Sequence, residues 1–494
     1  MRRILLGSLA IALGLVAILI IRALSIGSAD PVAAFSAISE AVDRDQLAGE
    51  LAEALKVKTI SAGEDAPPSR QSLNELHTLF RETYPGVYRT IELTVMPQGT
   101  LIYRWKGSDP NRKPFALLGH QDVVPVEEAT LDEWTHPPYG GVIDNGIIYG
   151  RGTLDNKGQV IAILSAAERL IARNFTPDQD IYFIFGHDEE IGGDNGAAAA
   201  VRYFRENNIQ FEFALDEGSG VVQGLIPGTD APFALISLSE KGSTTLRLTG
   251  RAPGGHSAAP GKDTAVSVVS RAMVAITDDP FPQKLDPVLV DFLHELARNA
   301  PFAQRIVLAN LWLFGPQVVN RLGNAPSTAA ALHTTTAPTI ISGGEKLNIL
   351  PQSVSAVVNF RIHPRDTVES VRLRTERVVN DDRVTIETLG GREPTGVSSK
   401  DSRAFNAITS TTAEVFGPIP TTPFLTLQGT DARHYETVAD DVYRFAPFIF
   451  GPKELERIHG TDEQVSVENL ARASSWYEAF MEKTAGSTTA SGVQ

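Results

Sequence analysis

Short apolar runs that end in histidine or acidic residues constrain the fold more than any other feature of the sequence. Phe115–Leu118, Ile181–Phe185 and Phe213–Leu215 have the length and composition of buried strands. Apolar residues at helical spacing occupy Gln159–Arg173 and Ala197–Asn207. Because strands that alternate with helices are typical of layered folds, we predict the α/β class, with a mixed, mostly parallel sheet flanked by helices.

The pattern changes after Lys241, where a smaller α+β unit with helices on one face of its sheet is predicted. Its elements are expected at Ser243–Leu248, Thr264–Ile276, Ser355–Ile362, Val368–Val379 and Val384–Leu389. Amphipathic helical stretches in Phe281–Leu322 are expected to elaborate this unit.

The order of these patterns predicts a discontinuous domain with an insertion. The first domain comprises residues 31–241 and 393–484, and the inserted domain comprises residues 242–392. Residues 1–30 form a separate N-terminal segment, and the small, polar tail 485–494 is predicted to be disordered.

The N-terminal segment indicates export. Arg2 and Arg3 precede the uncharged run Ile4–Ile21, which Arg22 closes and which would span about 27 Å as a helix. Two interpretations remain open: an uncleaved anchor, or a signal peptide cleaved near Gly27-Ser28-Ala29. A third interpretation is that the segment forms a buried helix of the soluble body. The first two place the body on the extracytoplasmic side, with the membrane contacted through this segment only.

Composition excludes several classes of protein. The net charge of −15, from 44 basic and 59 acidic residues, argues against a nucleic-acid partner. The chain has no cysteine, which excludes disulfide scaffolds, zinc fingers and thiolate catalysis. Any metal must therefore be held by His, Asp and Glu.

Five residues at strand ends or in glycine-rich loops form a candidate set of ligands for two metal ions. They are His120, Asp155, Glu190, Asp216 and His459. Zinc accepts this mixture of nitrogen and oxygen ligands, and a bridging carboxylate such as Asp155 would hold two ions about 3.5–4 Å apart. Spacing does not select the metal, so Co²⁺ or Mn²⁺ remain alternatives to Zn²⁺.

Asp122 and Glu189 are assigned supporting roles. Asp122 lies two residues after His120, so both side chains leave an extended segment on the same side, where the carboxylate can orient a metal-bound imidazole. Glu189 and Glu190 are adjacent and diverge, so that Glu190 can bind a metal while Glu189 faces water. The alternatives are a surface His–Asp pair, a helix N-cap for Asp155, and a solvated acidic loop.

These motifs together resemble the M20 family of metallopeptidases, in the branch of carboxypeptidase S and the secreted N-acyl-amino-acid hydrolase/synthases. The resemblance covers roughly Leu47 to Phe480. The motifs that carry it, in order, are His120–Val126, Trp134 with Pro137-Pro138, Tyr149–Gly158, His187–Glu190, Leu215–Gly218 and Ile458–Gly460. The family implies a zinc-peptidase catalytic domain with an inserted α+β lid.

The resemblance also implies a role for each metal-site residue. His120 and Asp216 would hold one Zn²⁺, Glu190 and His459 the second, and Asp155 would bridge them. Asp122 would orient His120, and Glu189 would act as the general base towards a metal-activated water.

In the lid, the resemblance implies that His256 of Gly254–Ser257 stabilises the oxyanion, in several relatives within the site of a partner subunit. Asn348 of Lys346–Pro351 and Arg361 of Asn359–Arg361 would hold the substrate carboxylate. Substrate-loop residues are expected within Gly429–His434, namely Gly429, Thr430 and Arg433. A homodimer formed through the lid is the partner that this implies.

The expected function is a di-zinc hydrolase that cleaves an amide bond next to a free carboxylate, in a small peptide or an N-acyl amino acid. Leu311–Phe314 is a candidate for acyl preference, although a packed core helix explains the same residues. The alternative functions are a narrow deacylase of one metabolite and a membrane-tethered binding protein without catalysis.

Overall fold

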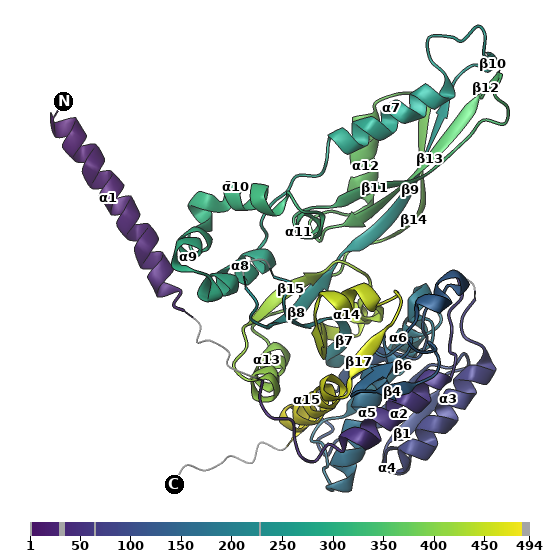
Figure 1. Ribbon diagram of the computed structural model, residues 1–494, viewed down its shortest axis with the longest axis vertical. Coiled ribbons are helices and arrows are strands. Elements are labelled where there is room, and N and C mark those ends of the chain that lie inside the picture. Colours follow the sequence, from purple (N-terminus) through teal and green to yellow (C-terminus); the bar gives the residue numbers. More distant parts are fainter. Residues whose placement is uncertain (1, 29–34, 64–65, 227–228, 487–494) are drawn as a thin grey trace.

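The computed structural model describes residues 2–28, 35–63, 66–226 and 229–486. A body built around one large sheet carries a long, narrow lid, and a single helix extends away from both (Figure 1).

The body contains an eight-stranded mixed sheet. In spatial order its strands are β1 (Glu92–Val95), β2 (Leu101–Trp105), β6 (Ile181–Gly186), β3 (Phe115–His120), β7 (Phe211–Val222), β16 (Ala439–Phe450), β8 (Phe233–Glu240) and β15 (Thr421–Thr426). The four central strands β6, β3, β7 and β16 are parallel. A three-stranded sheet of β17 (Gln464–Ser466), β5 (Ile147–Tyr149) and β4 (Val142–Asp144) lies apart from it.

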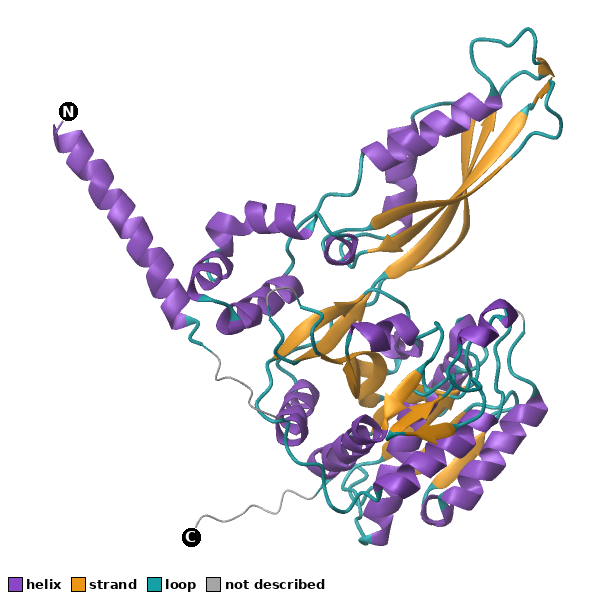
Figure 2. Cartoon of the chain, viewed as in Figure 1, coloured by secondary structure: helices purple, strands orange, loops and turns teal. Residues whose placement is uncertain are grey.

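Helices cover both faces of the large sheet (Figure 2). Within β3, Phe115 and Leu117 point to one face and Ala116 and Leu118 to the other, as the two-residue period of a strand requires. The first face packs on α2 (Arg44–Lys56), α3 (Arg70–Thr83), α4 (Pro85–Thr90), α5 (Lys157–Ala172), α13 (Arg403–Phe416) and α15 (Val467–Ala485). The second face packs on α6 (Ala197–Glu206) and η3 (Asp431–Thr437). The short elements η1 (Glu128–Glu133), η2 (Glu189–Ile191) and α14 (Pro452–Arg457) lie in loops.

The lid is a four-stranded antiparallel sheet with two helices on one face. Its strands, in spatial order, are β11 (Thr335–Ser342), β13 (Ser353–Ile362), β9 (Gly242–Arg251) and β14 (Val384–Arg392). Helices α7 (Ala265–Asp278) and α12 (Val368–Val379) pack on it, and the pair β10 (Gly255–His256) and β12 (Ile349–Leu350) forms the tip. The chain leaves the large sheet after β8 and returns to the body after β14. The boundaries at residues 242 and 392 stay a prediction.

The helical elaboration packs partly on the body. It consists of α8 (Pro287–Asn299), α9 (Phe302–Leu308), α10 (Leu311–Leu322) and α11 (Pro326–Ala330). Phe292 of α8 packs against Phe424 of β15, with 6.2 Å between ring centroids. This segment therefore covers the edge of the large sheet, although it belongs to the insertion in sequence.

Helix α1 (Arg2–Ser25) contains, among the described residues, the one stretch that is long and apolar enough to cross a membrane. It is consistent with a signal peptide or an anchor. Ala29 of the possible cleavage site lies outside the described residues.

The α/β class, with its mostly parallel sheet flanked by helices, is confirmed. Sequence analysis did not single out β16 or α15 as elements. Helix α15 runs to Ala485, whose carbonyl accepts a hydrogen bond from the Asp178 amide, and residues 487–494 of the predicted tail lie outside the described residues.

Candidate metal centre

The centre forms where the carboxyl ends of the parallel strands meet. His120 ends β3, and Glu189 and Glu190 lie in η2 directly after β6. Asp155 comes from the loop before α5, and His459 follows α14. Ligands bind at this edge in open α/β sheets because the loops after parallel strands converge there.

Asp155 lies between the two histidines. Its Oδ1 is 3.0 Å from His120 Nε2, and its Oδ2 is 2.9 Å from His459 Nε2. Glu190 Oε2 is 3.1 Å from the same nitrogen of His459. One carboxylate that faces two separate nitrogen atoms has the arrangement expected of a bridging ligand.

A cation fits this geometry. His120 Nδ1 lies 3.0 Å from the backbone oxygen of Asp122, which can only accept, so the neutral ring carries its proton on Nδ1. Its Nε2 is then an acceptor that faces two more acceptors, Asp155 Oδ1 and, at 3.3 Å, Glu217 Oε1. Only a proton or a metal ion between these atoms makes the arrangement favourable.

The pKa values of these groups also indicate that a proton or a cation is needed between them. Burial and the charge of Asp155 raise the pKa of Glu190 to about 7. Hydrogen bonds to Asp155 and Glu190 raise the pKa of His459 to about 10. Burial opposes charge on His120, but the charge of Glu217 and hydrogen bonds to Asp122 and Asp155 raise its pKa overall.

Asp122 orients the loop that carries both glutamates. Its carboxylate accepts hydrogen bonds from the amides of Glu189 and Glu190, at 3.2 and 3.1 Å, and from Ser61 Oγ at 2.7 Å. Its Oδ1 also lies 3.3 Å from His120 Nδ1. Asp122 therefore fixes the position of His120 relative to the η2 loop.

Asp216 does not point into the cluster. Its carboxylate accepts hydrogen bonds from the amides of Ala432, at 2.7 Å, and Glu217, at 2.9 Å. The next residue, Glu217, faces His120 instead, and its Oε2 accepts a hydrogen bond of 2.7 Å from Asn156 Nδ2. Successive side chains of a strand point to opposite sides, so only one of Asp216 and Glu217 can face His120. The position of β7 decides which of them does.

Two further residues that sequence analysis did not single out position the centre. The fully buried Glu463 accepts hydrogen bonds from the amides of Gly152, Leu154 and Asp155, and from Arg151 Nη1 at 2.8 Å. It follows His459 by four residues and so ties two distant segments together. Asn156 Oδ1 accepts from the His120 amide at 3.2 Å. In the sequence, Asn156 lies within the motif Tyr149–Gly158 and Glu463 follows the motif Ile458–Gly460, but nothing else marks either residue.

Glu189 lies on the His120 and Glu217 side of the cluster. One ligand atom from each of these three residues lies within 4.8 Å of the others. Burial raises the pKa of Glu189 well above its usual range, and the charge of Asp431 adds to this. Glu189 is thus placed to take up a proton rather than to form an ion pair.

The lid places its candidate residues at opposite ends. His256 and Asn348 lie at the tip, where the Asn348 carbonyl accepts a hydrogen bond of 3.1 Å from the Ser257 amide. Arg361 lies near the end of β13 that adjoins the body. The structure does not bring His256 and Asn348 to this chain's own metal centre (Figure 1).

The substrate-loop candidates lie beside the centre. Thr430 donates from its amide and its hydroxyl to Glu240 Oε2, at 3.2 and 2.9 Å, and Arg444 Nε donates to the same oxygen at 3.1 Å. Arg433 Nη1 donates to the Thr430 carbonyl. Glu240 is the last residue of β8, so the buried Glu240–Arg444 pair connects this loop to the start of the lid.

Arg392, which sequence analysis did not identify, adds to a group of cations beside the carboxylates. Its guanidinium packs against Gly429, and burial together with the charges of Arg433 and Arg361 lowers its pKa. Among the described residues, none of these three arginines has a carboxylate within ion-pair distance. Three unpaired guanidinium groups favour binding of an anion.

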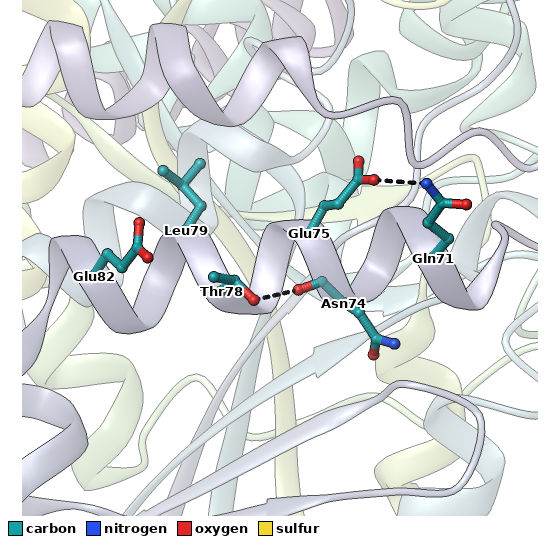
Figure 3. Close-up of a pocket in the computed structure, with 6 residues that line it drawn as sticks. All are labelled: Gln71, Asn74, Glu75, Thr78, Leu79 and Glu82. Atoms are coloured by element: carbon teal, nitrogen blue, oxygen red, sulfur yellow. Dashed lines mark hydrogen bonds between the residues drawn. The ribbon is translucent and has the colours of Figure 1, made fainter.

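A separate hollow lies on the exposed face of α3 (Figure 3). Gln71, Asn74, Glu75, Thr78, Leu79 and Glu82 line it. Several of its side chains are satisfied within the helix; for example, Gln71 donates to Glu75 at 3.0 Å. No residue of the metal centre lines this hollow.

Comparisons with known proteins identify the family of the chain. Residues 116–483 match the family described as Peptidase family M20/M25/M40. The chain is 37% identical over 464 residues to "Probable carboxypeptidase S-like 2" of Dictyostelium discoideum, covering 92% of this chain and 88% of the relative. It is 36% identical over 422 residues to "N-fatty-acyl-amino acid synthase/hydrolase PM20D1" of Mus musculus, covering 84% and 83%.

Solved structures support the fold. The M20 family metallo-carboxypeptidase Sso-CP2 of Sulfolobus solfataricus superposes with a TM-score of 0.63 at 18% identity, covering 88% of this chain and 98% of that one. Human carnosine dipeptidase 1 superposes with a TM-score of 0.60 at 17% identity, covering 89% and 96%.

We predict that binding of Co²⁺ to the metal-free protein strengthens as the pH rises through about 7. Glu190 and His459 must each lose a proton to become ligands, so the fraction of competent sites falls below the pKa of Glu190. Affinity should rise at least about tenfold between about pH 6 and pH 8, measured by the visible absorption of bound Co²⁺. Glu190→Gln should remove the part of this dependence that is centred near pH 7 and leave the part that is due to deprotonation of His459. An affinity independent of pH would contradict the prediction.

We further predict that Glu217→Gln and Asp216→Asn differ in metal content. Glu217→Gln should reduce the bound metal from about two ions to about one per chain, because it removes a carboxylate that faces His120. Asp216→Asn should keep both ions, because its oxygens face backbone amides. The metal content of both purified variants tests this prediction. Loss of one ion in Asp216→Asn but not in Glu217→Gln would identify Asp216 as the ligand.

Proposed function

The chain belongs to peptidase family M20/M25/M40, and from that premise we propose that it is a two-metal hydrolase cleaving an amide bond next to a free carboxylate. That it is a metal-dependent hydrolase follows from the family and from its relatives. The number of metal ions, the residue roles and the substrate are our proposal.

The arrangement of Asp155 between His120 and His459 is the observation that supports two metal ions. We assign His120, Asp155 and Glu217 to one ion, and Asp155, Glu190 and His459 to the other. Glu217 replaces Asp216 of the sequence-based set because its carboxylate faces His120. Zn²⁺ suits these ligands, and Co²⁺ or Mn²⁺ would also fit them.

Bound at this centre, two cations would lower the pKa of a water molecule and polarise the scissile carbonyl. Glu189 would accept the proton of the attacking water and donate it to the leaving amine, which its raised pKa favours. Asp122 would keep Glu189 in place through its bond to the Glu189 amide.

The arginines beside the centre support a substrate with a free carboxylate. Arg361 would bind that carboxylate through two parallel hydrogen bonds. Arg392 at the base of the lid and Arg433 of the body would add positive charge. Gly429 leaves the space that the Arg392 guanidinium occupies, because a side chain there would clash with it.

Both a C-terminal peptide and an N-acyl amino acid offer an amide next to a carboxylate. Names of relatives point to both, since one is a probable carboxypeptidase S-like protein and another an N-fatty-acyl-amino acid synthase/hydrolase. A narrow deacylase remains the alternative within this chemistry. A tethered binding protein is disfavoured because Glu189 stands at the cluster without serving as a ligand in the proposed set.

A homodimer through the lid is part of the proposal. His256 and Asn348 lie together at the lid tip, so they could serve a metal centre only in another copy of the chain. Placement of the body on the extracytoplasmic side is also proposed, on the basis of the apolar helix α1.

Replacing Glu189 by Gln tests the proposed function. We expect turnover of N-acyl amino acids and blocked dipeptides to fall by about 100-fold to 10,000-fold, as for loss of a general base. The metal content should stay unchanged, because Glu189 is not a ligand in the proposed set.

Glu75→Gln on the exposed face of α3 is the matched control and should leave turnover unchanged. Full activity of the Glu189→Gln variant, measured as released amino acid, would refute the general-base role.

Arg392→Gln should raise KM for substrates with a free carboxylate by about tenfold, because it removes a positive charge beside the carboxylate, an attraction of about 1–4 kcal/mol at close range. Substrates with an amidated C-terminus should show no further loss. Arg247→Gln, at an exposed position of the lid sheet, is the control. Equal losses on both substrate types would show that Arg392 serves the fold instead.

A further inference from the structure

The helices α9 and α10 lie at the base of α1. Asn310, between them, donates from Nδ2 to the Leu19 carbonyl at 3.1 Å. Arg22 Nε donates to the Ala309 carbonyl at 3.3 Å. Ala23 is fully buried, whereas the apolar window of α1 is otherwise exposed. Figure 1 shows α1, α9 and α10 gathered on one side of the body.

These contacts place α9 and α10 at a defined depth if α1 spans a bilayer. The apolar run of α1 ends at Arg22, and Leu19 lies three residues, about 4.5 Å along the helix axis, further into that run. Asn310 contacts Leu19 and therefore lies near the boundary between the hydrocarbon core and the headgroups.

The surface of this segment suits such a boundary. Phe302, Trp312 and Leu313 expose 46%, 58% and 36% of their surface. Residues 296–344 contain no Asp or Glu in a chain with 59 acidic residues, while Arg305 and Arg321 add positive charge within α9 and α10. Aromatic side chains with nearby arginines are typical of membrane interfaces, where anionic lipids attract the basic groups.

Neither the core nor the metal centre accounts for these exposed residues. Within α10 only Gly315 and Val318 are buried, so a packed core helix does not explain Trp312 and Leu313. The helix packs on α9 beside α1, away from the metal centre, which also argues against a role of Leu311–Phe314 in acyl preference (Figure 1).

We propose that α9 and α10 form a second membrane contact, a helical hairpin that lies in the headgroup region of an anionic bilayer beside the anchor α1. The occupant of the exposed face is the lipid surface into which α1 itself inserts. Two points of contact would fix the orientation of the body and lid relative to the membrane. With a single helix as anchor, the body could rotate.

Trp312 reports this contact directly, because the other three tryptophans, Trp105, Trp134 and Trp476, are buried. The full chain is reconstituted into vesicles of phosphatidylcholine and phosphatidylglycerol whose acyl chains carry bromine either near the headgroup or near the chain end. We expect bromine near the headgroup to quench Trp312 emission more strongly than bromine near the chain end, and Trp312→Phe to abolish the quenched component.

A matched control moves the exposed indole to the other side of the body. The double variant Trp312→Phe, Val95→Trp places it on the exposed edge strand β1, opposite α1 in Figure 1. Its emission should be insensitive to either brominated lipid and should be quenched by iodide in solution.

A charge substitution provides a second measurement. Leu313→Glu should reduce the quenching of Trp312 by brominated lipid, because a buried carboxylate opposes insertion and is repelled by anionic headgroups. Trp312 emission that iodide quenches and brominated lipid does not would overturn the proposal. Shielding from iodide that depends on protein concentration but not on lipid would assign the face to a second copy of the chain, and would also overturn it.

Discussion

Repulsion among buried carboxylates is the constraint on which the site depends. Asp155, Glu189, Glu190 and Glu217 converge at the ends of three parallel strands, where burial raises the pKa of each glutamate. Two imidazoles alone do not balance this charge, and the Nε2 of His120 faces carboxylates as an acceptor. Bound cations would balance this charge. The hydrogen bonds that Asp122 and Glu463 accept from the amides of Glu189 and Asp155 hold the loops in place despite the repulsion.

The charges around the centre are arranged asymmetrically. Acidic groups gather at the strand ends, whereas Arg361, Arg392 and Arg433 stand between the body and the base of the lid. A substrate with an amide next to a carboxylate would match this arrangement, with its carbonyl at the acids and its carboxylate at the arginines. The buried pair Glu240–Arg444 connects the two regions, because Glu240 holds Thr430 and immediately precedes the lid.

The insertion serves more than one region of the molecule. Its four-stranded sheet carries Arg361 at the base, and the β10–β12 pair carries His256 at the tip. Its helical part packs on the body through Phe292 and contacts α1 through Asn310. These roles need different surfaces, which explains why the helical part has exposed aromatic residues and the sheet has a conventional buried core.

The sequence alone determined the fold class, most elements and most residues of the candidate metal centre, because these depend on local patterns. A buried strand such as Ile181–Phe185 must be continuously apolar, and the acids that follow it are then placed at the strand end. Tertiary structure decided between residues and helix faces that the local sequence pattern does not distinguish. Asp216 and Glu217 are chemically alike, and only the setting of β7 directs Glu217 to His120. Arg392 and Glu463 acquire their roles from residues distant in the chain, and α10 is amphipathic whether it faces a core or a membrane. The physical reason is the same each time: residue type and spacing set what a side chain can do, and long-range packing sets what it meets.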